Sequence, residues 1–295
     1  LDGPFVIDQG PGLGKWKPAN YTNKFYGPSP MRLGIEKSRN LMTVRLAQTV
    51  GIEKVATYAE RLGVMDNIPR QLSMSLGAGE TTLLRLVTGY AMIVNSGKQI
   101  TPTLIDRIQD RNGKTVFRHD TRSCDGCQNI IWEGQEPPQP SDIRAELLDP
   151  GTAYQMVAML KGVVDRGTGV RIRAVGKSLA GKTGTTNESR DTWFIGFSPD
   201  LAVGVFAGFD NPISLGPKET GSSVAVPIFR DFMAAALENR PAIPFRVPSG
   251  IRLVRVNAST GVVAQRGEKR VILEAFKPGT EPTELGPILD GGYDP

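Results

Sequence analysis

The sequence predicts an α+β protein, because helical and strand-like segments occupy separate stretches of the chain. Apolar residues recur with helical spacing over 31–64 and 83–94. Three strand-like runs then follow one another at 171–183, 191–198 and 201–209. Parallel strands need a crossover connection, and no helix separates these runs, so an antiparallel arrangement fits them.

Composition gives loose bounds on function. The chain has 295 residues, of which 39% are hydrophobic and 22% charged, as in globular proteins with a sizeable core. The net charge of +5 comes from scattered residues, and no basic stripe interleaved with aromatic residues indicates nucleic-acid binding. No apolar run is long enough to cross a membrane. The chain begins at Leu1 without a targeting segment, so we expect a fragment of a longer protein.

The first hundred residues contain an extended segment followed by helices. Residues 1–30 are rich in Gly, Pro, Asn and Tyr and are expected to be loop-like. The positions that share a helical face are Leu41, Val44, Ala47 and Val50, and then Val55, Tyr58 and Leu62. A further helix is predicted over 83–94, with Thr82 as its cap and Gly97 just past its end.

The middle of the chain is predicted to form a hairpin and a long helix. Strands at 100–109 and 115–118 would be joined by a turn at Asn112-Gly113, and 120–148 is loop-like. A helix should begin at Pro150, with Asp149 or Thr152 as its cap, and end at Gly167.

The last part of the chain is predicted to form one more helix and a small β unit. The helix spans about 224–239 and ends before Pro241. Short strand-like runs at 251–256 and 270–274 lie between Pro- and Gly-rich turns. We therefore expect two domains, a main body over 1–240 and a β extension over 241–295.

The two cysteines, Cys124 and Cys127, form a single CxxC unit in polar sequence. A disulfide in an oxidising compartment is favoured because it uses both thiols. A zinc site would need His119 with Asp120 or Asp125 and ranks second. A redox motif should open a helix after a strand, which this segment does not resemble.

Residues 176–183 match the phosphate-binding pattern G-x-x-x-x-G-K-[ST] letter for letter. That loop requires a helix directly after it, whose N-terminus attracts the phosphates. Here Gly184, two threonines and an asparagine follow, and then strand-like sequence from Thr192. A β-hairpin is therefore predicted instead of a nucleotide-binding loop.

The shorter unit Lys182-Thr183-Gly184-Thr185 suits an edge strand that binds a peptide. Alternation places Thr183 and Thr185 on one face, and Lys182 and Gly184 on the other. Hydroxyl groups beside a lysine suit a substrate carboxylate. Gly184 allows a ligand backbone to approach closely, and an extended peptide could add along such an edge. An ordinary surface hairpin is the alternative.

Other segments bring this unit into a known pattern. Ser38-Arg39-Asn40 resembles an S-x-N motif, and Lys182-Thr183-Gly184 the K-T-G motif, of the penicillin-binding proteins. The flanking stretches WKPAN (16–20), VVDRGTG (163–169), DTWFIGF (191–197) and VGVFAGFDNP (203–212) are also similar to the bifunctional class A members. The resemblance covers nearly the whole chain.

This resemblance implies the penicillin-recognising serine transpeptidase fold, an antiparallel sheet with helices on both faces. The family's nucleophile is the serine of S-x-x-K, and no serine of this chain has a lysine three residues later. In the family that motif lies upstream of the stretch resembling residues 1–26. We therefore expect a truncated transpeptidase domain, lacking its nucleophile helix and first strands, with an incomplete sheet and no acyl-enzyme activity of its own.

The resemblance also implies roles for individual residues. Ser38 would relay a proton toward the leaving amine, and Asn40 would hold the peptide. Lys182 would tune the field around Ser38. Thr183 and Thr185 would bind the terminal carboxylate, and the Thr185 amide would form half of the oxyanion hole. Ser38 and Asn40 could instead cap the helix that follows them.

The implied partners are peptidoglycan stem peptides, β-lactams and an upstream glycosyltransferase domain of the same protein, with a membrane anchor outside this chain. The implied location is the periplasmic face of the inner membrane. No cofactor, metal or nucleic acid is expected. A non-catalytic module that binds cell-wall peptide is the alternative function.

Overall fold

A three-stranded antiparallel sheet lies at the centre of the computed structural model, which describes residues 1–8, 14–124, 127, 131, 134, 136–138 and 140–282. Its strands are β5 (Ala180–Thr185), β6 (Thr192–Phe197) and β7 (Ala202–Ala207), in the order β5-β6-β7. Both pairings are antiparallel, as the sequence predicts, since short connections can join only antiparallel neighbours.

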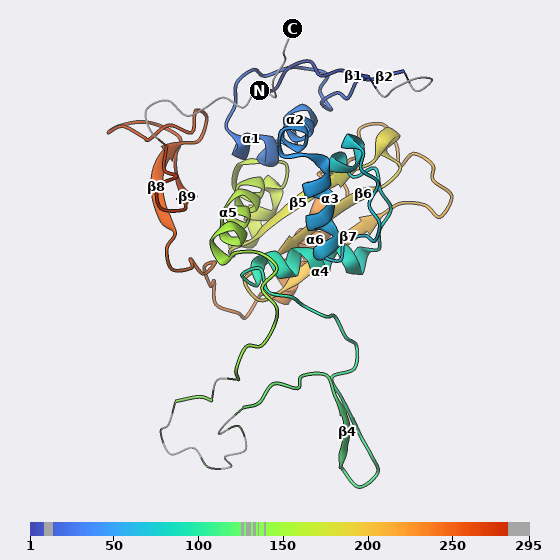
Figure 1. The fold of residues 1–295 in the computed structure, drawn as a ribbon, viewed down its shortest axis with the longest axis vertical. Helices are drawn as coiled ribbons and strands as arrows, with labels where there is room; N and C mark the ends of the chain where they lie inside the picture. Colours follow the sequence, from blue (N-terminus) through green and yellow to red (C-terminus); the bar gives the residue numbers. More distant parts are fainter. Residues whose placement is uncertain are drawn as a thin grey trace.

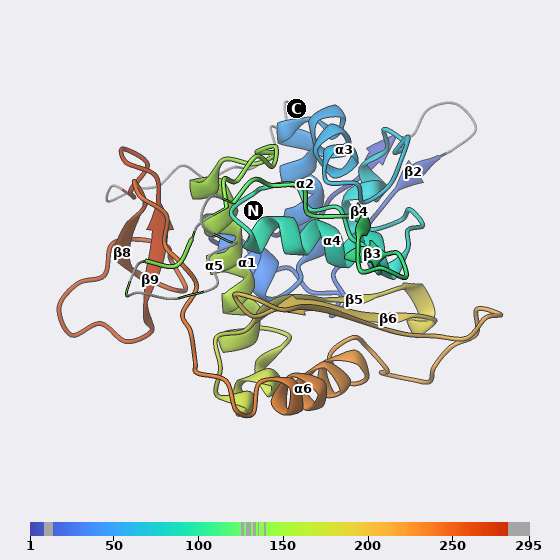
Figure 2. The same cartoon turned by 90° about the horizontal axis from the view of Figure 1, so that it is seen from below.

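Helices cover both faces of this sheet. Figure 2 shows α4 (Leu83–Val94) and α5 (Pro150–Arg166) on one side and α6 (Ala225–Ala236) on the other. This layered arrangement is the α+β architecture expected from the sequence.

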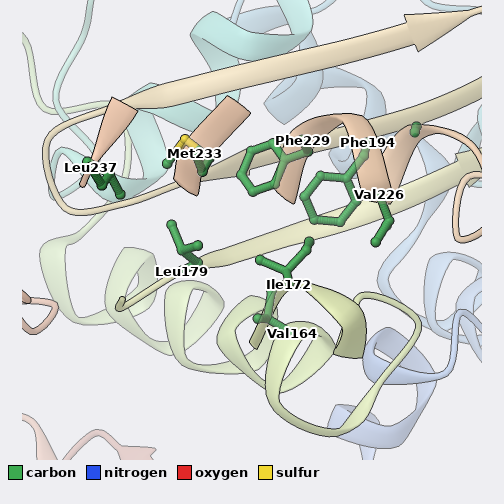
Figure 3. Close-up of a cluster of buried hydrophobic side chains, with 9 residues drawn as sticks. Val164, Ile172, Leu179, Phe194, Val226, Phe229, Met233 and Leu237 are labelled. Carbon is green, nitrogen blue, oxygen red and sulfur yellow. The ribbon is translucent and has the colours of Figure 1, made fainter. Parts of the chain in front are cut away.

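Two apolar clusters fill the layers. The cluster between the sheet and α6 is drawn in Figure 3 and includes Val164, Ile172, Leu179, Phe194, Val226, Phe229, Met233 and Leu237. The Phe194 and Phe229 rings meet with centroids 4.7 Å apart. On the other face, Val157 and Leu160 of α5 pack against strand residues Ala180 and Phe197. Apolar packing on both faces therefore holds the sheet, and with it the edge strand β5, in place.

The helical stretch predicted over 31–64 consists of three helices, α1 (Met31–Glu36), α2 (Asn40–Val50) and α3 (Ile52–Arg61). The chain leaves the helical conformation at Ser38, with φ of 52°, and at Gly51, with φ of 94°. Because of these two breaks, the three helices do not form one continuous helix with a single buried face.

Burial along these helices agrees only in part with the predicted faces. Leu41, Val44 and Ala47 are buried as predicted, but Val50 and Tyr58 are exposed. In α3 the buried residue is Ala56, whereas Val55 and Leu62 are half-buried, so the predicted face of that helix is only partly buried. The small size of Ala56 gives it little weight in an argument from periodicity, although alanine is among the residues most often buried.

The strand predicted over 171–183 is wrong in its first half. A 3-10 helix, η2 (Val170–Val175), occupies this part and ends where Gly176 adopts φ of 70°. Ile172 of η2 is fully buried in the core, so tertiary packing outweighs the β-propensity of this run. The strand begins only at Ala180 and extends to Thr185.

Among the described residues between α4 and α5, those that carry β4 (Thr115–Arg118) project from the body as an arm (Figure 1). The same segment also carries β3 (Arg107–Gln109), so the predicted strand 100–109 is much shorter than expected. Gly113 in the turn has φ of 81°, as the Asn-Gly signal requires. Cys124 and Cys127 are joined by a disulfide bond within this segment.

The two ends of the described chain add small β units. Near the start, β1 (Ile7–Asp8) pairs with β2 (Lys15–Trp16), and η1 (Leu72–Leu76) lies after α3. After α6 the chain forms the hairpin β8 (Arg252–Asn257) and β9 (Val271–Phe276), which lies beside α5 (Figure 1).

Two predicted helix caps are present. The Thr82 hydroxyl accepts the Arg85 N–H at 3.2 Å, and Asp149 accepts the Thr152 N–H at 2.8 Å. Among the described helices, none has the length and apolar character that a membrane span requires.

Candidate active site

Ser38 and Lys182 meet although 144 residues separate them. The Lys182 Nζ donates a hydrogen bond to the Ser38 Oγ at 2.7 Å and another to the Thr183 carbonyl oxygen at 2.9 Å. Ser38 lies in the turn between α1 and α2, and Lys182 lies in β5. Tertiary packing thus brings together two of the residues that the sequence selected.

Burial lowers the pKa of Lys182 from 10.5 to about 8, because a buried site disfavours the charged ammonium. Below that pH the ammonium donates to Ser38, and above it the neutral amine can accept a proton. A lysine with a pKa near neutrality beside a serine hydroxyl suits proton transfer.

Strand β5 is an edge strand of the central sheet, as predicted. Its register pairs Thr183 with Phe194 and Gly184 with Trp193, so lysine and threonine side chains alternate between faces. An added Cβ at Gly184 would lie 3.1 Å from the Trp193 Cβ. Glycine at this position therefore leaves room for the Trp193 side chain.

The hydroxyls of Thr183 and Thr185 have partners that the sequence did not reveal. The Thr183 Oγ1 lies 2.8 Å from the Thr168 Oγ1. The Thr185 Oγ1 accepts the Gly221 N–H at 3.0 Å. The Ser222 hydroxyl donates to the Thr168 carbonyl at 2.5 Å and so links these two contacts.

The additional residues Thr168 and Gly221 differ in how far the sequence indicated them. Thr168 lies in the VVDRGTG stretch that supports the resemblance, but no role could be given to it from sequence. Gly221 lies so close to β5 that an added Cβ would be 2.6 Å from the carbonyl oxygens of Gly184 and Trp193. No local pattern predicts that approach, because it joins segments that are distant in sequence.

Neither Ser38 nor Asn40 caps a helix. Helix α2 begins at Asn40, and its cap position is Arg39, whose own side chain makes no capping hydrogen bond. The Asn40 Nδ2 donates to the Ala19 carbonyl at 2.8 Å, and the Asn20 Oδ1 accepts the Leu41 N–H at 3.3 Å. The capping alternative for the S-x-N triplet is therefore wrong.

Arg39, the middle residue of this triplet, ties it to the N-terminal segment. Its guanidinium lies over the Tyr26 ring, 3.9 Å from the centroid. Its Nη1 donates to the Ser29 hydroxyl at 3.1 Å and lies 3.5 Å from the fully buried carboxylate of Asp2. The S-x-N turn is thus anchored before Ser38 and Asn40 meet any ligand.

The geometry gives little support to the two alternative sites, a phosphate-binding loop at Lys182 and a zinc site near His119. After β5 the chain forms only the three-residue η3 (Asn187–Ser189) and then β6, so the α-helix that a phosphate-binding loop needs directly after Lys182 and Thr183 does not follow. Within the described part of the chain, no three acidic, histidine or cysteine side chains gather as metal ligands would. The zinc alternative also involves Asp125, which lies outside the described residues.

Comparison with known proteins supports the same family. A family model described as the penicillin binding protein transpeptidase domain matches residues 2–234. Penicillin-binding protein 1A of Rickettsia bellii is 45% identical over 283 residues, covering 94% of this chain and 35% of that protein. Its counterpart from Pseudomonas aeruginosa is 32% identical over 310 residues, covering 94% and 38%.

A solved structure agrees with these relatives. The crystal structure of penicillin-binding protein 1A from Haemophilus influenzae superposes with a TM-score of 0.80 at 30% identity, covering 96% of this chain and 44% of that one. The chain spans about a third of the length of the curated relatives named above. Because the family model matches residues 2–234, this chain belongs to the penicillin-binding protein transpeptidase family.

Proposed function

We propose that this chain is the C-terminal part of a D,D-transpeptidase domain that cross-links peptidoglycan stem peptides. The observation that carries the proposal is the 2.7 Å contact between Lys182 and Ser38, beside an edge strand whose residues Thr183 and Thr185 have hydroxyl groups. A proton relay and a carboxylate-binding edge are what acyl transfer from a D-Ala-D-Ala terminus requires.

In the complete protein, the S-x-x-K serine would attack the carbonyl between the two terminal D-alanines. The C–N bond breaks, the acyl group stays on the serine as an ester, and D-alanine leaves as an amine. Ser38, backed by Lys182, would pass a proton to that amine. The amine of a second stem peptide would then attack the ester, forming the cross-link and restoring the serine hydroxyl.

Strand β5 would bind the substrate. Thr183 and Thr185 would bind the terminal carboxylate, assisted by the protonated Lys182, and Asn40 would hold the peptide through its amide. Gly184 would leave space for the peptide backbone. The Thr185 N–H would donate to the developing oxyanion, a type of contact that is worth about 3–4 kcal/mol in the transition state.

The same site would bind β-lactams, which resemble the substrate and would acylate the same serine. We place the complete protein at the periplasmic face of the inner membrane, where stem peptides occur, with an anchor and a glycosyltransferase domain upstream. The disulfide between Cys124 and Cys127 supports an oxidising compartment. Within the chain, 1–240 would be the transpeptidase part and 241–295 the β extension.

Covalent labelling with fluorescent penicillin tests the proposal. The full-length protein should be labelled, Lys182→Ala should slow labelling by roughly 100-fold, and the isolated chain should not react because it contains no S-x-x-K serine. An unlabelled full-length protein would reject the enzyme proposal.

A non-catalytic module that binds cell-wall peptide is the second candidate, and the missing S-x-x-K is the observation that favours it. The full-length protein would then bind a D-Ala-D-Ala peptide reversibly and remain unlabelled by penicillin. Finding Ser-x-x-Lys in the gene upstream of Leu1 would reject this candidate.

A further inference from the structure

A buried carboxylate two residues before Ser38 joins three parts of the molecule. The Glu36 side chain is 1% exposed and lies at the end of α1. Its Oε1 accepts hydrogen bonds from the Arg32 Nη1 at 2.7 Å and from the Arg166 Nη2, at the end of α5, at 2.6 Å. Such charge-assisted bonds are among the strongest side-chain contacts in proteins.

The backbone around Glu36 is held as firmly as its side chain. The Glu36 carbonyl accepts the Thr168 N–H at 3.1 Å, and the Lys37 ammonium donates to the Arg166 carbonyl. Thr168 in turn contacts Thr183 of β5. The same short segment therefore adjoins both Ser38 and the residue next to Lys182.

Two glycines of the neighbouring segment make room for Glu36. An added Cβ at Gly162, within α5, would overlap the Glu36 carboxylate. One at Gly167, which ends α5, would overlap the Glu36 carbonyl oxygen. The close approach of α1 to α5 thus depends on the two glycines as well as on Glu36.

Ser38 itself needs such support. Its φ of 52° is in the left-handed region, which costs a non-glycine residue free energy and persists only where the surroundings impose it. The Ser38 N–H donates to the Ile35 carbonyl, and the Arg39 N–H to the Gly34 carbonyl, so the turn is built directly on the end of α1. A shift of Glu36 would therefore move the Ser38 hydroxyl relative to Lys182.

We propose that Glu36 is a positioning residue for Ser38: its buried carboxylate, bound by Arg32 and Arg166, fixes the end of α1 against α5 and sets the Ser38 hydroxyl opposite Lys182. The inference rests on the proposed acyl-transfer function. Glu36 touches no substrate, so it acts only through the geometry of Ser38.

A double-mutant cycle on the full-length protein tests this role. Glu36→Gln keeps the shape of the side chain and removes its charge. It should slow acylation by penicillin roughly 10- to 100-fold, since small misplacements of catalytic groups have effects of that size. In a Ser38→Ala background the same change should slow acylation less than about twofold, because the group it positions is gone.

Controls separate positioning from damage to the fold. Asp66→Asn removes a comparable but exposed ion pair, with Arg85, and should leave the acylation rate unchanged. If Glu36→Gln does not fold, Arg166→Gln removes one partner of the carboxylate from a half-buried position and should show the same dependence on Ser38.

The outcomes are distinguishable. An equal loss of rate in the wild-type and Ser38→Ala backgrounds, or no loss in either, would overturn the positioning role while the enzyme remains labelled. A wild-type protein that penicillin does not label would overturn the proposed function and this inference with it.

Discussion

At the scale of single residues, the site depends on where ordinary side chains are buried. A lysine and a serine on the surface would have no special reactivity, but Lys182 loses solvent and donates to Ser38 at 2.7 Å. Desolvation of the ammonium is the cause of its lowered pKa, so the effect comes from packing and not from residue type.

The lowered pKa of Lys182 predicts the pH dependence of ligand binding. The ammonium loses its proton as the pH rises through about 8, instead of 10.5, so attraction of an anionic penicillin carboxylate should weaken above pH 8. Lys182→Arg stays protonated over this range and should move the decline to higher pH. Stopped-flow acylation at several penicillin concentrations would separate binding from the acylation step.

The wild-type protein and Lys182→Arg should differ in the pH at which affinity for penicillin declines. If both proteins lose affinity around pH 8, another group is titrating and the assignment to Lys182 is incorrect.

At the scale of elements, the edge strand and the helix ends position the site. Strand β5 presents Lys182 and Thr183 because β6 and the flanking helices hold it in register. Helix α5 ends at Arg166, where it meets Glu36. At its other end Asp149 caps the helix and lies 2.7 Å from the Lys277 Nζ.

Removing the α5 cap should destabilise the protein. Asp149→Ala should lower the free energy of unfolding by about 1 kcal/mol, the usual cost of losing an N-cap. Asp149→Asn keeps a capping oxygen and should cost less. Thermal unfolding of the two variants measures the difference, and equal losses would show that the ion pair with Lys277 outweighs the cap.

The pKa of Asp149 adds a pH dependence to the same contact. The hydrogen bond from Lys277, followed by those from Thr152, lowers this pKa from 3.8 to about 2. The carboxylate therefore stabilises the fold above about pH 4, and this contribution is lost as the pH falls toward 2.

At the scale of the whole molecule, the hairpin of β8 and β9 is fastened to the body formed by the central sheet and its helices. Glu274 of β9 binds Arg32 through both carboxylate oxygens, and Arg32 also binds Glu36. The Gln155 amide of α5 donates to the Ala275 carbonyl at 3.0 Å. The hairpin thus contacts Arg32, the same arginine that binds the Glu36 carboxylate.

This attachment predicts sensitivity to protease. Glu274→Gln should loosen the hairpin and speed tryptic cleavage after the exposed Arg246, in the connection between α6 and β8, by roughly tenfold. Hydrogen bonds to charged groups contribute about 1.5–3 kcal/mol each, which is enough for such a change.

Mass spectrometry of the fragments would follow the cleavage. Arg252→Gln, which removes an exposed ion pair with Glu281, is the matched control and should leave the rate unchanged. Equal rates for wild type and Glu274→Gln would mean that other contacts hold the hairpin.

The sequence by itself determined much of the local structure. Residues unsuited to a helix after Thr183 and the strand-like run from Thr192 predicted the β5–β6 hairpin. Thr82 was recognisable as a cap, and Asp149 was one of two candidates for the cap of α5. The residues that carry the candidate chemistry, Ser38 and Lys182, were identified because their short motifs resemble those of the penicillin-binding proteins.

Only the tertiary structure decided how these pieces are joined. The 3-10 helix η2 replaced a predicted strand because the core required Ile172, and the contacts of Thr168, Gly221 and Glu36 link segments far apart in sequence. Periodicity and propensity act over a few residues, whereas packing is set by the whole chain. The sequence could name the serine and the lysine, but only the fold brings them within 2.7 Å.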